Sequence, residues 1–140
     1  VAMVGPEEID SLNILRATHK AMALAVSSLS ETPDIALVDG LPVKGLPVCH
    51  EALVKGDGLS LSIAAASVIA KVTRDRFMES IERKFPAYGF ARHHGYGTRE
   101  HLEALRKHGP CHHHRRSFQP VSQLALQAGD GSVWLAQVDG

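Results

Sequence analysis

Two aspartates in this 140-residue sequence stand where a short strand-like run gives way to glycine. Asp39 follows the apolar run 35–38, and Asp57 lies between two glycines after a second run, 51–55. Ligands of α/β proteins gather at the carboxyl ends of strands, and carboxylate oxygens suit hard cations such as Mg²⁺. Together the two aspartates predict a divalent-cation site. Taken alone, either is better explained as an ordinary turn residue, because Asp-Gly is a common turn dipeptide.

A second candidate region, residues 88–98, mixes aromatic and cationic side chains. An aromatic ring can stack on a sugar or base while nearby cations hold phosphates, so this mixture suits a nucleic-acid surface. Arg92 and His94 are the candidate phosphate contacts, and Tyr96 is expected at the surface. The alternative is that the aromatic side chains anchor the loop in a core, which we expect for Phe90.

The stretch from Arg92 to Arg116 is locally basic within a chain whose formal net charge is zero. It holds six arginines and lysines and seven of the nine histidines, against two glutamates. Such a segment indicates a phosphate-binding surface and, equally well, a solvated face. The histidines in its last part, 112–116, suggest a zinc site. Adjacent histidines point in different directions, however, and the sequence has no second ligand pair at zinc-finger spacing. A basic patch near nucleic acid, or a solvated stretch, explains it better.

Periodicity and capping residues predict the elements that must position these groups. Helices are expected to begin at Pro6, after Asn13, after Ser60 or Ser62 and after Thr98, and to end near Leu29, at Lys84 and at His108. A buried strand is expected at 35–38 and a second short strand at 51–55. Residues 87–97 are expected to form a functional loop. Helices alternating with strands predict an α/β class.

Composition and cysteine usage narrow the class of protein. The chain is 44% hydrophobic and 21% charged, as in a soluble globular domain. No apolar run approaches the ~20 residues that span a bilayer, and no signal peptide is visible. Cys49 and Cys111 stand apart, which favours a reduced, cytoplasmic protein over a disulfide between them. The compact pattern covers residues 1–121, and residues 122–140 form a tail to which we assign no fold.

Nine short segments, read in order, carry a resemblance to a known family. They are Pro6–Asp10, Asn13–Leu15, Leu37–Gly40, Lys55–Asp57, Ala64–Ser67, Ala70–Arg76, Tyr88–Phe90, His94–Thr98 and His114–Phe118. Their order resembles ribonuclease HII of bacteria over residues 3 to 121. The resemblance implies a ribonuclease H-like α/β fold with a mixed central sheet. It also implies an endonuclease that hydrolyses the RNA strand of RNA–DNA hybrids and cuts at ribonucleotides embedded in duplex DNA, leaving 5′-phosphate and 3′-hydroxyl ends.

The same resemblance implies roles for individual residues. The family uses Mg²⁺ or Mn²⁺ held by four carboxylates, of which Asp39 matches the third and Asp57 the fourth. Tyr96 matches the tyrosine that stacks on the deoxyribose just after the ribonucleotide, and such stacking helps to distinguish an RNA-to-DNA junction from plain DNA. In the resulting hypothesis Lys55, Arg92 and His94 contact phosphate. We also expect a monomer that binds no membrane.

The chain departs from the family pattern in one large respect. The family's first strand carries an adjacent Asp-Glu pair and then a Gly-Arg-Gly segment that reads the 2′-hydroxyl, and neither occurs in this sequence. We therefore expect an N-terminally truncated chain whose mixed sheet lacks its first strands and whose C-terminal half is rich in helix. By itself it should show little or no nuclease activity. The alternatives are a non-catalytic module that binds nucleic acid through residues 92–116, an inactive gene fragment and, last, a zinc-binding histidine module.

Overall fold

The computed structural model describes residues 1–127, with side chains described to residue 124. The chain divides into two compact units. Unit 1 contains residues 1–4 and 11–73, and unit 2 contains residues 5–10 and those from 74 onward. Helices α1 (Pro6–Leu12) and α3 (Leu61–Glu82) contribute residues to both units. Of the predicted tail, residues 128–140 lie outside the described residues.

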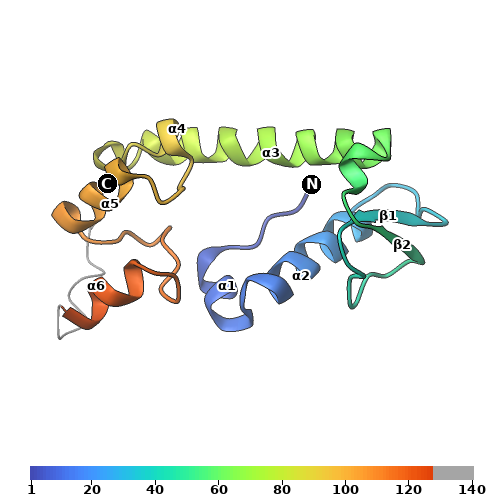
Figure 1. The fold of residues 1–140 in the computed structure, drawn as a ribbon, viewed down its shortest axis with the longest axis horizontal. Coiled ribbons are helices and arrows are strands. Elements are labelled where there is room, and N and C mark those ends of the chain that lie inside the picture. Colours follow the sequence, from blue (N-terminus) through green and yellow to red (C-terminus); the bar gives the residue numbers. More distant parts are fainter. Residues whose placement is uncertain (128–140) are drawn as a thin grey trace. The chain divides into compact units, whose positions relative to one another are not determined.

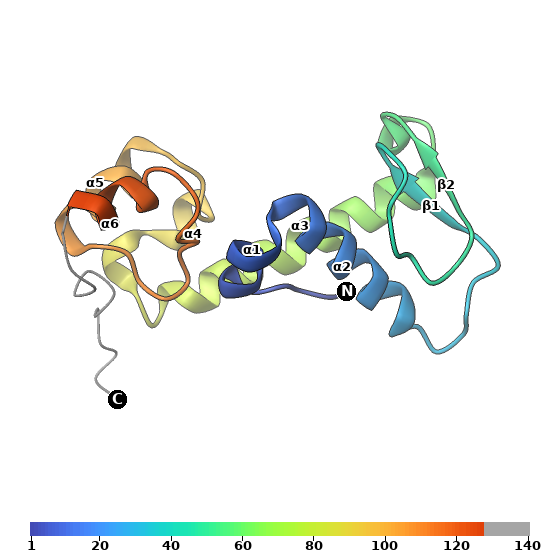
Figure 2. The same ribbon diagram turned by 90° about the horizontal axis from the view of Figure 1, so that it is seen from below.

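Unit 1 is built around a two-stranded parallel sheet. Strand β1 (Ala36–Asp39) pairs with β2 (His50–Leu53), with Ala36 opposite His50 and Asp39 opposite Leu53, and Figures 1 and 2 show the two strands side by side. The unit also contains helix α2 (Ile14–Ser27), the 3₁₀ turn η1 (Gly56–Gly58) and the first part of α3. Parallel strands among helices confirm the predicted α/β class. Since the strands are parallel, their carboxyl ends lie at one edge of the sheet.

The first strand is less buried than the sequence predicts. In β1 only Val38 is buried, and its neighbour Leu37 is 40% exposed. Successive side chains of a strand point to opposite faces, so Leu37 lies on the face opposite Val38. That face stays open to solvent in the described part of the chain. The strand predicted at 35–38 is therefore confirmed as a strand, at Ala36–Asp39, but its predicted burial is wrong. Ile35, which precedes β1, is itself exposed.

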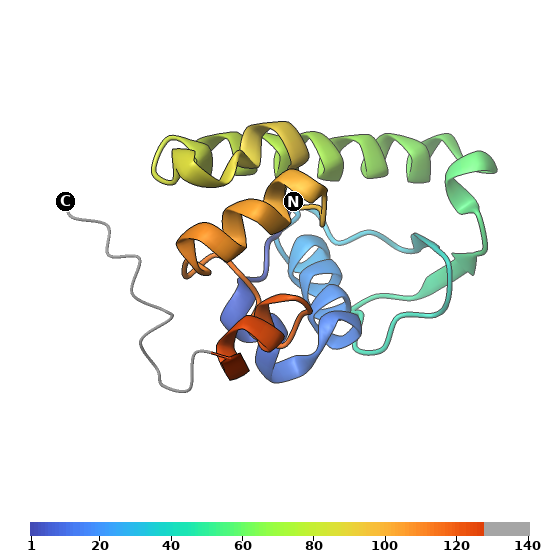
Figure 3. The ribbon, with the colours of Figure 1, turned by 60° about the vertical axis from the view of Figure 1, so that its left-hand side comes forward.

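Unit 2 is helical and has its own hydrophobic core. It contains the second part of α3, the 3₁₀ turn η2 (Pro86–Tyr88), and helices α4 (Phe90–His93), α5 (Arg99–His108) and α6 (Val121–Gln127). Figure 3 shows α5 and α6 as neighbours. The buried core consists of Ile81, Phe85, Tyr88, Phe90, Leu105, Cys111 and Val121. The burial of Phe90 confirms its predicted place in a core.

Residues 87–97 differ from the loop that the sequence predicts. Much of this segment is helical, because η2 and α4 occupy it up to His93. Gly89 and His94 both have left-handed φ values, 72° and 48°, and these residues bound α4 at its two ends. Within this segment only Gly89 and residues 94–97 lie outside the helices.

Local capping sets helix ends close to their predicted positions. The Asn13 side chain accepts a hydrogen bond from Arg16 N before α2, and Thr98 Oγ1 accepts one from His101 N before α5. Both are N-cap interactions, and both confirm the prediction, as does the end of α5 at His108. Helix α3 begins directly after Ser60 and ends at Glu82, two residues before the predicted Lys84.

Two simpler expectations can also be compared with the structure. Cys49, in unit 1, is an exposed free thiol, and Cys111, in unit 2, is a buried one. Across the described residues, no helix combines the length and the apolar character needed to cross a membrane.

Candidate functional site

The Asp39 carboxylate is held against the turn that carries Asp57. Asp39 is the last residue of β1, and its Oδ1 accepts a hydrogen bond of 2.8 Å from Gly56 N. Gly56 and Asp57 are consecutive residues of η1, which follows β2. Asp57 Oδ1 in turn accepts a hydrogen bond of 2.9 Å from Gly58 N. The structure thus brings the two aspartates together at the carboxyl edge of the sheet.

Close packing explains why a glycine precedes Asp57. Gly56 is buried, and a Cβ at this position would lie 2.6 Å from Ile63 Cδ1 and 3.1 Å from Leu53 Cβ. Only a residue without a side chain lets the backbone N–H approach Asp39 while Ile63 stays buried. The Gly-Asp-Gly segment signals a turn in the sequence, but it does not reveal this contact with α3. Lys55, just before the turn, is exposed and has a left-handed φ of 57°.

The two exposed carboxylates fit part of the oxygen shell of a divalent cation. Each gives one oxygen to a backbone N–H, and among the described residues neither Asp39 nor Asp57 forms an ion pair with a cationic side chain. Hard cations such as Mg²⁺ take oxygen ligands and keep several waters, so two carboxylates are a suitable but incomplete set. Within residues 1–127, no three or more His, Cys, Asp or Glu side chains cluster as metal ligands would.

In unit 2, Tyr96 presents an exposed ring from a well-held backbone. The residue is 64% exposed, while Tyr96 N donates to His93 O and Tyr96 O accepts from Thr98 N, both at 2.8 Å. The guanidinium of Arg74 lies over the ring, with Cζ 5.1 Å from the ring centroid. An exposed ring beside a cation suits stacking on a sugar or base. The predicted surface position of Tyr96 is confirmed, whereas no signal in the sequence connects Arg74 with it.

Arg92 and His94, the predicted phosphate contacts in unit 2, each lie beside an acidic residue. Arg92 Nη2 forms an ion pair with Glu100 Oε1, although the Arg92 side chain remains 70% exposed. His94 Nδ1 lies 3.8 Å from Asp75 Oδ1 and has no hydrogen-bond partner among the described residues, although it is buried. The sequence did not indicate either acidic neighbour.

Three histidines of the locally basic segment belong to the core. His93, His101 and His114 are only 5%, 6% and 8% exposed, and the rings of all three lie beside that of Phe90. Burial lowers the pKa of His101 and lowers that of His114 to about 4, so neither ring carries charge at neutral pH. The prediction of a basic or solvated stretch at 112–116 is therefore wrong for His114, because its ring fills space in an aromatic core.

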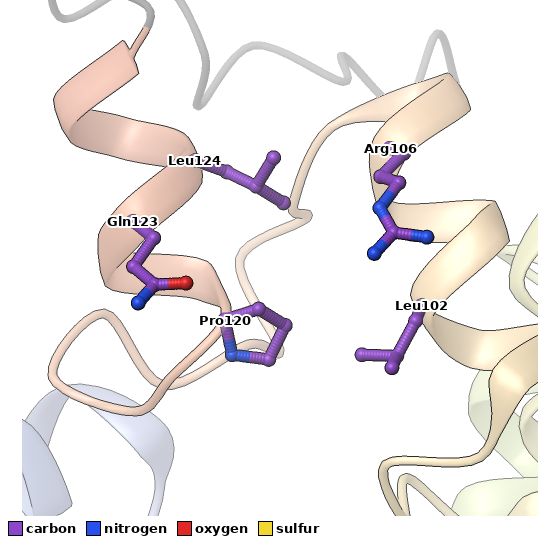
Figure 4. Close-up of a pocket in the computed structure, with 5 residues that line it drawn as sticks. All are labelled: Leu102, Arg106, Pro120, Gln123 and Leu124. Carbon is purple, nitrogen blue, oxygen red and sulfur yellow. The ribbon is translucent and has the colours of Figure 1, made fainter.

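Unit 2 also contains a small pocket of about 160 Å³ between α5 and α6. Its lining consists of Leu102, Arg106, Pro120, Gln123 and Leu124, and Figure 4 shows the Arg106 and Leu124 side chains extending into the space from opposite sides. None of the predicted site residues lines this pocket. The candidate functional residues therefore form two separate groups, the strand-end aspartates in unit 1 and the surface around Tyr96 in unit 2.

Comparison with known proteins shows to which family the chain belongs. The family model for ribonuclease HII matches residues 2–121. The chain belongs to the ribonuclease HII family. Ribonuclease HII of Paraburkholderia xenovorans (strain LB400) is 53% identical over 131 residues, which are 94% of this chain and 53% of that protein. Ribonuclease HII of Burkholderia mallei (strain SAVP1) is 56% identical over 123 residues, which are 88% of this chain and 58% of that protein.

The extent of these matches matters for the site. The chain spans about half the length of the curated ribonucleases HII that it matches. The stretch that matches the ribonuclease HII model includes all six predicted functional residues: Asp39, Lys55 and Asp57 in unit 1, and Arg92, His94 and Tyr96 in unit 2.

Proposed function

We propose that this chain forms part of an endonuclease that hydrolyses the RNA strand of RNA–DNA hybrids and cuts at ribonucleotides embedded in duplex DNA. The products carry 5′-phosphate and 3′-hydroxyl ends. Membership of the ribonuclease HII family supports the reaction class. The single structural observation that supports the site is the hydrogen bond from Gly56 N to Asp39 Oδ1, because it places a carboxylate beside the turn of Asp57.

In this proposal the residues of unit 1 hold Mg²⁺ or Mn²⁺. Asp39 is a direct ligand, because one oxygen is fixed by Gly56 and the other faces no cationic partner among the described residues. Asp57 completes the cation's shell, and the exposed Lys55 contacts a phosphate. The chemistry that such a cation supplies is activation of water and neutralisation of charge on the phosphate.

The residues of unit 2 position the nucleic acid. The Tyr96 ring stacks on the deoxyribose next to the ribonucleotide, and stacking on an aromatic side chain is worth about 1–3 kcal/mol per base. Arg92 and His94 contact phosphates of the same duplex. For Arg92 this requires the guanidinium to be shared with Glu100, which its high exposure allows.

By itself the chain is proposed to cut poorly, as a monomer with an incomplete site. Its sequence carries neither the Asp-Glu pair nor the Gly-Arg-Gly segment of the ribonuclease HII pattern. A ribonuclease H-like mixed sheet would need further strands beside β1 and β2. Two carboxylates hold a cation weakly and position it loosely, and small misplacements cost large factors in rate.

A chimera tests the function directly. In it, the chain replaces the stretch that it matches in the Burkholderia mallei ribonuclease HII, and the substrate is a DNA duplex with one ribonucleotide. We expect cleavage at the ribonucleotide, and a loss of more than about a hundredfold for Asp39→Asn, since the amide keeps the acceptor for Gly56 but loses the charge. The matched control is Asp34→Asn, at an exposed residue that precedes the strand. An inactive chimera, or an Asp39→Asn chimera of full activity, would overturn the proposal.

A second candidate, a non-catalytic nucleic-acid-binding module, is favoured by the exposed Tyr96 ring under Arg74. Its test uses the chain alone and a labelled RNA–DNA hybrid. Salt-dependent binding without cutting in Mn²⁺ supports the module. Strong cutting by the chain alone would exclude the module and also refute the proposed weak activity.

A further inference from the structure

The side chains of His101 and His114 form a hydrogen-bonded chain that ends on the backbone of Tyr96. His114 Nε2 lies 3.1 Å from His101 Nε2, and His101 Nδ1 lies 2.9 Å from Tyr96 O. The other end of this series of hydrogen bonds is Cys111 N, which lies 3.0 Å from His114 Nδ1. All of these atoms belong to unit 2. The proposed function gives Tyr96 a role in stacking but none to either histidine.

A fixed donor decides where the protons lie. Cys111 N is a backbone N–H and can only donate, so His114 Nδ1 accepts and its ring proton sits on Nε2. Cys111 O and Cys111 Sγ each lie 3.2 Å from the same nitrogen, but a nitrogen that accepts from Cys111 N carries no proton to donate to either atom. The His114 Nε2 proton is then donated to His101 Nε2. The remaining proton of His101 must therefore sit on Nδ1, from which it is donated to Tyr96 O.

The opposite arrangement is disfavoured by the same distances. A proton on His101 Nε2 would leave its Nδ1 lone pair 2.9 Å from the Tyr96 carbonyl oxygen, so that two acceptors would face each other. A second proton on His101 would set its Nε2–H against that of His114 at 3.1 Å, and a second proton on His114 would set its Nδ1–H against Cys111 N–H at 3.0 Å. Burial, which lowers the pKa of both histidines, keeps the rings in their neutral forms.

A third histidine, His93, stacks on the ring of His101 and also binds the backbone N–H of Tyr96. The rings of His93 and His101 are stacked, with centroids 4.4 Å apart. His93 Nδ1 accepts from Gly95 N at 3.2 Å, so its Nε2 proton is donated to Tyr88 O at 2.7 Å. The carbonyl of His93 accepts from Tyr96 N. Tyr96 is thus exposed at its ring while its backbone N–H and C=O are both bound to this histidine cluster.

We propose that His101 is a positioning residue, held by His114 in the tautomer with the proton on Nδ1, and that this hydrogen bond sets the position of the Tyr96 ring for substrate stacking. The inference rests on the proposed function for its last step. The tautomer and the ring position are properties of the chain alone.

The first test needs no substitution. ¹⁵N-edited NMR of the full chain reports which imidazole nitrogen carries the proton. We expect the Nδ1–H tautomer for His101 and the Nε2–H tautomer for His114. An Nε2–H tautomer at His101 would overturn the proposal.

The second test uses two amide substitutions that each preserve one half of the ring. In His101→Asn the amide lies near the former Nδ1 and keeps the bond to Tyr96 O, whereas in His101→Gln it lies near the former Nε2 and keeps only the bond to His114. The chain has two tyrosines, so ¹³C signals of the Tyr96 ring can be followed singly. We expect them to move in the glutamine variant and to stay close to wild type in the asparagine variant. Equal shifts in both would show that His101 only fills space.

The last step is tested by binding of a fluorescent duplex containing one ribonucleotide. We expect about a tenfold loss of affinity for His101→Gln, about the same for Tyr96→Ala, and less than about threefold for His101→Asn, since loss of one stacking contact is worth roughly this factor. If Tyr96→Ala binds like wild type, the stacking role in the proposed function fails, while the NMR results still decide the positioning of the ring. If Tyr96→Ala weakens binding and His101→Gln does not, the positioning role fails and the stacking role stands.

Discussion

Replacing Gly56 by alanine should disturb the unit 1 site without touching either carboxylate. The added Cβ would lie 2.6 Å from Ile63 Cδ1 and 3.1 Å from Leu53 Cβ, whereas carbon atoms in contact prefer about 3.5–4.0 Å. The terminal methyl group of Ile63 must therefore move by about 1 Å, and Ile63 is only 4% exposed. Overpacking of this kind destabilises a protein by about 1–3 kcal/mol. We expect Gly56→Ala to lower the free energy of unfolding by about 2 kcal/mol.

A double-mutant cycle isolates this clash from other effects of the substitution. Ile63→Val removes Cδ1, the atom that the new Cβ would meet, and by itself should cost about 1 kcal/mol. If the clash is real, the double variant should be little less stable than Ile63→Val alone, because only the contact with Leu53 remains. That outcome corresponds to a coupling free energy of about 1–2 kcal/mol.

Urea unfolding followed by circular dichroism measures the four free energies, and Mn²⁺ titration of each variant measures the site. Gly56→Ala should weaken Mn²⁺ binding by displacing the N–H that holds Asp39, and Ile63→Val should restore it. The matched control is Gly58→Ala, in the same turn, where an added Cβ meets nothing within 4 Å. Additive costs in the cycle, or an equal loss in the Gly58 variant, would refute the packing argument.

Three further outcomes follow from unit 2. Because burial lowers the pKa of His114 to about 4, the unfolded chain binds the extra proton first as pH falls below about 6.5. Between about pH 7.5 and pH 5 the contribution of His114 to the free energy of unfolding should therefore drop by about 2 kcal/mol. In urea titrations His114→Gln should reduce the pH dependence by this amount, whereas His112→Gln, at an exposed neighbour, should retain it. Burial acts to raise the pKa of Asp10, but the hydrogen bonds that its carboxylate accepts lower it overall. Asp10→Asn should thus lower the free energy of unfolding by about 1 kcal/mol near neutral pH and by less in acid, while Glu7→Gln, on the same helix, changes little. Thr98→Ala should cost about 1 kcal/mol through loss of the α5 cap, and Thr98→Ser, which keeps the hydroxyl, should show a smaller loss of melting temperature.

Features that depend on neighbouring residues could be predicted from the sequence. The caps at Asn13 and Thr98 were readable because the acceptor and the donated N–H are three residues apart. The strand end at Asp39 was readable because an apolar run stops there. The contact between Asp39 and Gly56 spans 17 residues and depends on parallel pairing of β1 with β2, which short-range patterns do not encode. For the same reason the sequence marks Gly56 as a turn residue but does not show that Ile63 requires it.

The predicted burial of β1 failed for a different reason. The run at 35–38 is apolar on both faces of the strand. Such a run predicts that other parts of the protein cover both faces. In unit 1 only the face of Val38 is covered, and Leu37 remains exposed. The pattern therefore reports how apolar the strand is, whereas its burial depends on which strands and helices lie beside it.

The histidine-rich segment shows how burial changes the meaning of a charge count. Of its histidines, His93, His101 and His114 are buried in an aromatic core, and the hydrogen bond between His101 and His114 requires neutral rings. Both glutamates of the segment are used as well, since Glu100 pairs with Arg92 and Glu103 with Arg99. Fewer free cations remain at this surface than the sequence suggests. If unit 2 binds nucleic acid, the Tyr96 ring and the histidines that hold its backbone must therefore contribute more than net charge, and binding should depend on ring position at least as strongly as on salt.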